Sequence, residues 1–178
     1  GVHLALDVAP DLAVFAKAMS NGYPMAAIIG RASVMAVAEA CFVSSTYWTE
    51  AIGPVAALST IAEFDRTQPW PRLQQAGAHI VAAWEAAARR HGQPITVRSS
   101  GALSNFAFQG EEANVAKTLF TRGMLARGFL ASTAFYAASA HTDADLADYA
   151  IACDAAFADI AAARVRGALR TALPGPEA

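Results

Sequence analysis

The residue best suited to covalent chemistry is Lys17, in the stretch DLAVFAKAMSNGYP (11–24). Apolar residues precede it, the turn-forming residues SNGYP follow it, and the chain has only one other lysine, Lys117. If these neighbours partly bury the side chain, desolvation lowers the pKa of its ammonium group and leaves a neutral amine. Such an amine is a nucleophile that forms a Schiff base with a carbonyl compound. The alternative is a solvated surface lysine, which is what we expect of Lys117.

Pyridoxal phosphate is a carbonyl cofactor that needs a lysine, a phosphate cradle and an acidic partner for its pyridine nitrogen. Thr49 is a candidate for the cradle, because it precedes a predicted helix and helix N-termini favour phosphate. Its alternative role is that of an ordinary strand or capping residue. Asp7 and Asp11 lie shortly before Lys17, but we assign neither of them to the pyridine nitrogen.

The composition limits the classes of protein to which the chain can belong. Its 178 residues are 55% hydrophobic and 16% charged, which is typical of a chain with a sizeable core. The net charge of −2, without a basic stripe, gives no electrostatic support for binding nucleic acid. Cys41 and Cys153 are not in a metal-ligand spacing, so we expect reduced, buried thiols and no metal. With no leader and no membrane-spanning run, we expect a cytoplasmic protein.

The elements that must position Lys17 and Thr49 follow the pattern of part of an α/β domain. Short apolar runs alternate with Ala-rich stretches and turn signals in this part of the chain. The predicted elements are a strand at 25–30, a helix at 32–40 with Ser33 as its N-cap, a strand or extended loop at 41–50, and a helix at 53–66 with Pro54 in its first position.

The pattern changes near residue 93 to that of an α+β domain. We therefore expect residues 1–93 to be part of a large domain, 94–170 a small C-terminal domain, and 171–178 a tail. The predicted elements are a helix at 70–90, two strands within 95–110 that bend at Gly101, a helix at 111–128, a strand or extended piece at 129–135, and a helix at 141–165 with a capping box formed by Thr142 and Asp145.

Three segments resemble one enzyme family. PDLAVFAKAMSNGYPMAAIIGR (10–31) resembles the lysine segment of class III pyridoxal-phosphate-dependent aminotransferases. TYWTEAIGPVAALSTI (46–61) resembles the second signature of that family, a Thr five residues before a Pro that opens an Ala-rich helix. The segment from Gly123 to Phe157 resembles the C-terminal domain of the glutamate-1-semialdehyde 2,1-aminomutase branch. The resemblance runs in order along essentially the whole chain.

The resemblance implies a fold, a cofactor and two site residues. The fold is of the aspartate-aminotransferase type (fold type I), with a large α/β domain and a small α+β C-terminal domain. The cofactor is pyridoxal 5'-phosphate. Lys17 matches the lysine that forms the Schiff base and shuttles the proton, and Thr49 matches the threonine that reaches the cofactor phosphate of the neighbouring subunit. The implied enzyme is a homodimer that moves an amino group from an amine or amino acid to a carbonyl acceptor.

Two departures from the family leave alternatives open. The acid for the pyridine nitrogen, the Gly/Ser phosphate loop and the ring-stacking aromatic of the family lie upstream of residue 1, so we expect a C-terminal fragment. Such a fragment could be inactive alone. Tyr136 follows TAF where the aminomutase has Glu, which favours an aminotransferase, with the aminomutase as the alternative. We expect His141 to have a structural role at a helix entry.

Tyr47 and Trp48 also lie near the predicted helix N-terminus. The sequence leaves two roles open for these aromatic side chains. They line either the substrate site or an interface between subunits.

Overall fold

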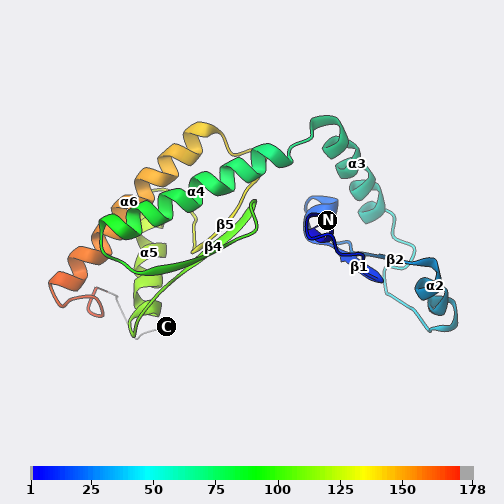
Figure 1. Cartoon of the computed structure of the whole chain (residues 1–178), viewed down its shortest axis with the longest axis horizontal. Helices are drawn as coiled ribbons and strands as arrows, with labels where there is room; N and C mark the ends of the chain where they lie inside the picture. The colour runs from blue at the N-terminus through cyan, green and yellow to red at the C-terminus, as the bar shows by residue number, and fades with distance from the viewer. Residues whose placement is uncertain (1, 173–178) are drawn as a thin grey trace. The chain divides into compact units, whose positions relative to one another are not determined.

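The computed structural model describes residues 2–172 and divides into two compact units between Gln68 and Pro69 (Figure 1). We call the part up to Gln68 unit 1 and the part from Pro69 unit 2. Helix α4 (Trp70–Arg90) belongs to unit 2, whereas the sequence places a domain boundary after it, near residue 93. That boundary stays a prediction for the domains of the complete protein. Of the predicted tail, residues 173–178 lie outside the described residues.

Unit 1 contains a two-stranded antiparallel sheet and short helices before one long helix. In the sheet, Leu12 lies opposite Gly30 and Phe15 lies opposite Ala27. The strand predicted at 25–30 and the helix predicted at 53–66 are confirmed. The elements are α1 (Val2–Ala5), β1 (Leu12–Phe15), the 3-10 helix η1 (Lys17–Ser20), β2 (Ala27–Gly30), α2 (Ala32–Met35), the 3-10 helix η2 (Ala36–Ala40) and α3 (Ile52–Thr67).

Two details of unit 1 differ from the predictions, and a third decides between the strand and the extended loop predicted at 41–50. Residues 41–51 form a loop with turns, because local hydrogen bonds such as Tyr47 N–H to Ser45 Oγ compete with a strand ladder. Ser33 is not an N-cap, since α2 begins at Ala32, one residue before it. Pro54 occupies the third helical position of α3 instead of the first, where its missing N–H is still harmless.

Unit 2 has the predicted order of two strands, a helix, a strand and a helix. Its antiparallel sheet has the order β3-β4-β5. Besides α4, its elements are β3 (Ile95–Ser99), β4 (Leu103–Phe108), α5 (Ala113–Ala126), β5 (Ala134–Tyr136) and α6 (Asp143–Val165). Strand β5 is shorter than the predicted 129–135. The chain leaves α5 through Gly128 at a positive φ, and the N–H of Phe129 bonds back to Met124, so this N–H is not available to the sheet.

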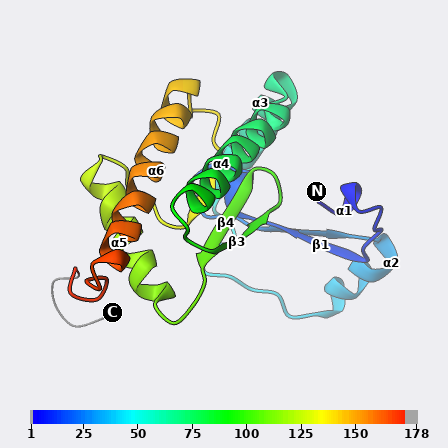
Figure 2. The same ribbon diagram turned by 60° about the vertical axis from the view of Figure 1, so that its left-hand side comes forward.

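The core of unit 2 lies on one face of this sheet. Alternate residues of β4 are buried, including Phe106 and Phe108, while the residues between them are exposed. Helices α4, α5 and α6 pack on the buried face (Figure 2). The Phe106 ring contacts Trp84, Phe120 and Phe157 at centroid distances of 4.9, 5.2 and 5.8 Å. This aromatic cluster holds three helices to the sheet.

Helix α4 also passes very close to the β3–β4 turn. A Cβ atom added at Gly77 of α4 would overlap the carbonyl oxygen of Gly101 in that turn. Gly101 itself has a φ of 81°, which favours glycine. The two glycines therefore let helix and turn approach each other.

The two cysteines have opposite environments. Cys153 on α6 is fully buried, and burial together with the nearby Asp154 charge raises the pKa of its thiol to about 12. Cys41 is exposed in the loop that precedes α3. The expectation of two buried thiols is therefore wrong for Cys41, because the loop that carries it has no covering layer in unit 1.

The start of α6 confirms the predicted capping box. Thr142 Oγ1 accepts a hydrogen bond from the N–H of Asp145 at 3.1 Å, and Asp145 Oδ2 accepts one from the N–H of Thr142 at 2.8 Å. Among residues 2–172, no helix combines the length and hydropathy needed to cross a bilayer.

Candidate active site

Lys17 lies two residues after the end of β1, as the first residue of η1, with a left-handed φ of 57°. This conformation is uncommon for a residue with a side chain, and such residues cluster at functional sites. The side chain is exposed, so the predicted partial burial is wrong for this chain. The reason lies in the sheet, which leaves Leu12 and Val14 of β1 exposed and has no second layer over the lysine in unit 1.

The turn after Lys17 is held by a serine that sequence reasoning missed. Ser20 is 1% exposed, and its hydroxyl donates a hydrogen bond to the carbonyl oxygen of Tyr23. Asn21 and Gly22 both have positive φ angles, of 46° and 105°. Because Ser, Asn and Gly commonly form such turns, SNGYP predicts the turn but not the burial of its serine.

Asp11 has a structural partner at the sheet. Its carboxylate pairs with Arg31 at 3.1 Å, and its carbonyl oxygen accepts the N–H of Arg31, also at 3.1 Å. Arg31 further donates to the carbonyl oxygen of Ala9 at 3.3 Å. These bonds tie the start of β1 to the end of β2. They give Asp11 a role in holding the two strands together.

Thr49 lies at the end of a turn over residues 46–49, three residues before the first residue of α3, and is exposed. The residue that caps the helix is its neighbour Glu50, which sequence reasoning missed. The Glu50 carboxylate accepts the N–H of Ile52 at 2.6 Å and the N–H of Gly53 at 3.3 Å. Of the expected phosphate cradle, the Thr49 hydroxyl is accessible. The backbone N–H groups at the start of the helix, however, already bond to Glu50.

The segments that carry Lys17 and Thr49 lie in the same unit, and η1 packs against α3. Gly53 makes the close approach possible, since a Cβ atom there would lie 3.2 Å from both Pro24 O and Met25 Cβ. Helix α3 is thus fixed against the turn that follows Lys17. Among residues 2–172, no hydrogen bond joins the two side chains themselves.

The other candidate residues have simpler environments. Tyr47 and Trp48 are 77% and 66% exposed, so they are free to contact a substrate or another chain. Lys117 is exposed on α5, as expected. His141 accepts the N–H of Ala138 at 3.2 Å, which confirms its structural role before α6.

Tyr136 is the residue that departs from the aminomutase pattern. It is 68% exposed at the end of β5. No described hydrogen bond fixes its hydroxyl, so the phenol is available for contacts outside unit 2.

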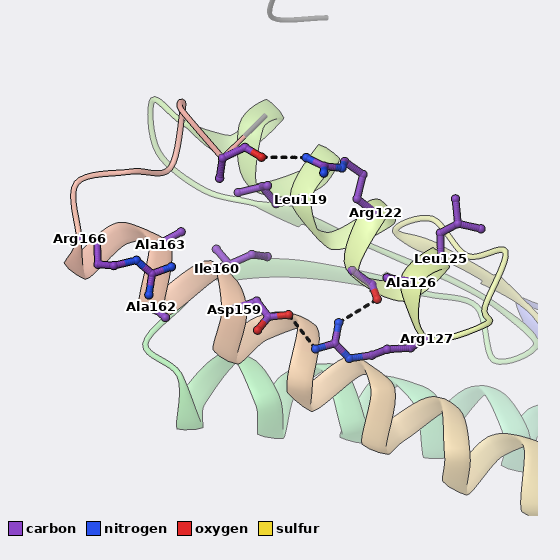
Figure 3. Close-up of a pocket in the computed structure, with 12 residues that line it drawn as sticks. Leu119, Arg122, Leu125, Ala126, Arg127, Asp159, Ile160, Ala162, Ala163 and Arg166 are labelled. Carbon is purple, nitrogen blue, oxygen red and sulfur yellow. Dashed lines mark hydrogen bonds and ion pairs between the residues drawn. The ribbon is translucent and has the colours of Figure 1, made fainter. Parts of the chain in front are cut away.

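A groove between α5 and α6 contains neither Lys17 nor Thr49 (Figure 3). Its volume is about 610 Å³, and Arg122, Arg127 and Asp159 are among its lining residues. Arg122 donates to Ala172 O at 2.8 Å and Arg127 pairs with Asp159 at 2.7 Å, so contacts within unit 2 already engage these charges. Within residues 2–172 no group of three or more His, Cys, Asp or Glu side chains could hold a metal ion.

The sequence comparisons point to one enzyme family. The family model described as aminotransferase class-III matches residues 2–151. The chain is 33% identical over 122 residues to a 3-aminobutyryl-CoA aminotransferase of Cloacimonas acidaminovorans, covering 68% of this chain and 30% of that protein. It is 30% identical over 165 residues to a glutamate-1-semialdehyde 2,1-aminomutase of Sorangium cellulosum, covering 84% and 38%. The chain thus spans about a third of the length of these curated relatives.

Solved structures share the fold. The pyridoxal phosphate internal aldimine form of the FumI protein from Sphingopyxis sp. MTA144 has a TM-score of 0.81 at 24% identity, over 92% of this chain and 40% of that one. An omega-transaminase from Sphaerobacter thermophilus has a TM-score of 0.80 at 20% identity, over 89% and 41%. These similarities confirm the predicted fold of the aspartate-aminotransferase type.

Proposed function

Because the chain belongs to the class III aminotransferase family, whose members use pyridoxal 5'-phosphate, we propose that it is the lysine-bearing part of an aminotransferase. The enzyme moves an amino group from an amine or amino acid to a carbonyl acceptor. The observation that carries this proposal is the position of Lys17, an accessible amine two residues after the end of β1 on a left-handed backbone.

Lys17 has two tasks in this proposal. Its amine would hold the carbonyl carbon of the bound cofactor as a Schiff base, with loss of water, and the exposure of Lys17 permits this. Once the amino group of the substrate has displaced the lysine, the freed Nζ would take a proton from the substrate carbon and deliver it to the cofactor carbon. The bound cofactor supplies the electron sink for this transfer. The bonded turn around Ser20 keeps the backbone that carries the lysine in place.

Thr49 is proposed as a contact to the cofactor phosphate of a neighbouring subunit, in a cytoplasmic homodimer. Its hydroxyl is exposed next to the start of α3, where a second chain can reach it. Tyr47 and Trp48 are exposed in the same loop and would be covered by such a partner. Their burial against a second chain would offset the cost of exposing two large aromatic side chains.

The aminomutase activity is the second candidate function. One specific observation favours it: the similarity to the Sorangium cellulosum aminomutase covers 84% of the chain. Tyr136 argues against it, because a phenol replaces the carboxylate that the aminomutase branch has after this strand. We therefore rank transfer between two substrates ahead of exchange within one.

The first prediction concerns covalent attachment at Lys17. The test mixes pyridoxal phosphate with this chain, and with the chain extended by whatever upstream residues its gene encodes. Borohydride reduction then fixes the cofactor, and peptide mass spectrometry locates it. We expect the adduct on Lys17 in the extended protein, together with an absorbance band that Lys17→Ala removes.

The matched control is Lys117→Ala, which removes the other lysine, exposed on α5, and should leave band and adduct unchanged. An extended protein that binds the cofactor without an adduct on Lys17 would show that the proposed function is wrong. Whether the short chain also forms the adduct tells how much of the site it holds.

A further inference from the structure

The groove between α5 and α6 combines an apolar base with charged edges (Figure 3). Leu119 and Ile160 form part of its base, where they join the core of unit 2. Leu125 also lines the groove and is 59% exposed, so it offers apolar surface that unit 2 leaves uncovered. The volume of about 610 Å³ is that of a site for a small organic ligand, since such sites are mostly apolar with a few polar groups.

The charged side chains of the groove are mostly positive. Arg122, Arg127 and Arg166 line it, and Asp159 is the one acidic residue among the described residues that do so. Arg127 pairs with Asp159 at 2.7 Å, so this positive charge is neutralised. Arg122 bonds to the carbonyl oxygen of Ala172, which carries no net charge and leaves the guanidinium charge uncompensated. The groove is thus a cationic site in a chain whose net charge is −2, and it attracts anions.

Arg166 is the lining cation whose side chain is free. It ends α6, and its backbone is held by a hydrogen bond from its N–H to Ala162 O at 3.2 Å. The side chain is exposed, and within residues 2–172 no hydrogen bond or ion pair engages it. A guanidinium binds a carboxylate through two parallel N–H bonds. Because one guanidinium is free, the matching group is a singly charged carboxylate and not a phosphate, whose higher charge calls for more donors.

We propose that this groove binds a small aliphatic carboxylate. The Arg166 guanidinium holds the carboxylate, and the aliphatic chain covers Leu119 and Ile160. The charge of Arg122 in the same groove adds attraction at longer range. Each methylene that leaves water strengthens binding, so the affinity rises with the length of the chain until the groove is filled. The inference concerns unit 2 alone and does not depend on Lys17 or on the proposed function.

The test titrates the full chain with octanoate at neutral pH and constant ionic strength. The methyl signals of Ile160 and the Nε–H signal of Arg166 are followed by NMR, because the two report on the two ends of the ligand. Two related compounds separate the contributions. Octanol keeps the chain without the charge, and butanoate keeps the charge with a shorter chain. Each should bind at least about fivefold more weakly than octanoate, since each lacks one of the two contacts.

The first set of variants tests the role of the guanidinium. Arg166→Gln should weaken octanoate binding by about threefold to tenfold, because an exposed ion pair contributes less than a buried one. Arg166→Lys should fall between, since it keeps the charge but loses the planar fork. Arg98→Gln is the matched control. Arg98 is an exposed arginine on β3 that does not line the groove, and its replacement changes the net charge equally. Equal losses from both Gln variants would point to net charge alone and would overturn the proposal.

The second set tests the groove itself. Ala162 is exposed on α6 and lines the groove, so Ala162→Phe should fill it and abolish octanoate binding. Ala147→Phe adds the same ring to an exposed position of α6 outside the groove and should leave the affinity unchanged. Octanoate binding that neither Ala162→Phe nor Arg166→Gln reduces would overturn the proposal, as would a lack of octanoate binding by the unchanged chain. The Arg166 variants decide the question if Ala162→Phe does not fold.

A second copy of the chain is the other occupant that the experiment distinguishes. Sedimentation equilibrium is measured at the protein concentrations of the titration, with and without octanoate. The proposal expects no change in mass between the unchanged chain and Ala162→Phe. A dimer that Ala162→Phe dissociates would show that the groove is a contact between copies, and would overturn the assignment to a small carboxylate.

Discussion

Asp145 lies in the first turn of helix α6 and makes the stability of that helix end depend on pH. Hydrogen bonds from the hydroxyl and the N–H of Thr142 hold the pKa of the Asp145 carboxyl below its usual range. A lowered folded pKa means that the carboxylate stabilises the fold above the ordinary aspartate pKa. That contribution is lost as the pH falls through the lowered folded value.

We predict that Asp145→Asn reduces the drop in the free energy of unfolding between neutral and acidic pH. Thermal unfolding, followed by circular dichroism from neutral pH into the acid range, measures it. The variant should be less stable than the unchanged chain at neutral pH, with a difference that narrows in acid. Asp148→Asn, an exposed acid on the same helix, should leave the difference between neutral and acid stability unchanged. The same pH profile for both variants would contradict the prediction.

Residue types and spacing predicted some site features but not others. Lys17 and the capping box of Thr142 and Asp145 could be found, because each depends on a local pattern. The exposure of Lys17 could not, because burial depends on layers from distant parts of a protein. Glu50 was missed because the hydroxyl residue Thr49 precedes the helix and was considered as its capping residue. Pro54 could have indicated the role of Glu50. It has no N–H, so only the amides of the two residues before it need a capping carboxylate.

At the scale of elements, the crossing of α4 and the β3–β4 turn has little tolerance for added volume. Gly77→Ala places a methyl group against the carbonyl oxygen of Gly101, and backbone cannot move aside as a flexible side chain can. We expect the free energy of unfolding to fall by about 1–3 kcal/mol, as for other overpacked sites. Urea unfolding followed by Trp fluorescence checks this.

The control for this prediction is Ala78→Ser, on the exposed side of α4, which should change the free energy of unfolding by less than about 0.5 kcal/mol. A Gly77→Ala variant as stable as this control would show that the helix can shift away from the turn at no cost.

The elements themselves were predictable to different degrees. Long helices with regular apolar spacing, such as α4 and α6, agree with the sequence to within a few residues. The segment 41–50 is rich in β-branched and aromatic residues, yet side-chain hydrogen bonds within it favour turns. Strand β5 begins only at Ala134, after the chain has left α5 through a turn in which the N–H of Phe129 bonds to Met124 O. Such competition between local bonds is not visible in propensity alone.

At the scale of the whole molecule, the two units differ in how many of their apolar side chains are buried. Unit 2 has a continuous core around Phe106, Phe120 and Phe157, whereas unit 1 leaves apolar side chains such as Ile28, Ile29 and Leu58 exposed. We predict that amide hydrogen exchange is slowest in α4, β4 and α6 and much faster throughout unit 1, because local stability follows buried apolar contact. Equal protection of α3 and α6 would contradict this.

The sequence predicted the fold class and the change in pattern along the chain. The division between units 1 and 2 falls before α4, because it depends on which neighbours this helix packs against. The domain boundary near residue 93 stays a prediction. Contacts of α4 with the sheet and with α6 bring this helix into unit 2.

The contrast between Cys41 and Cys153 makes the chain suitable for attaching a single probe. Cys153 is shielded and remains protonated at neutral pH, so thiol reagents do not modify it while α6 is packed. Cys41 is exposed in the loop that leads to Thr49 and Glu50. A fluorophore or spin label therefore attaches to the same loop as the candidate phosphate contact without any cysteine of this chain being mutated.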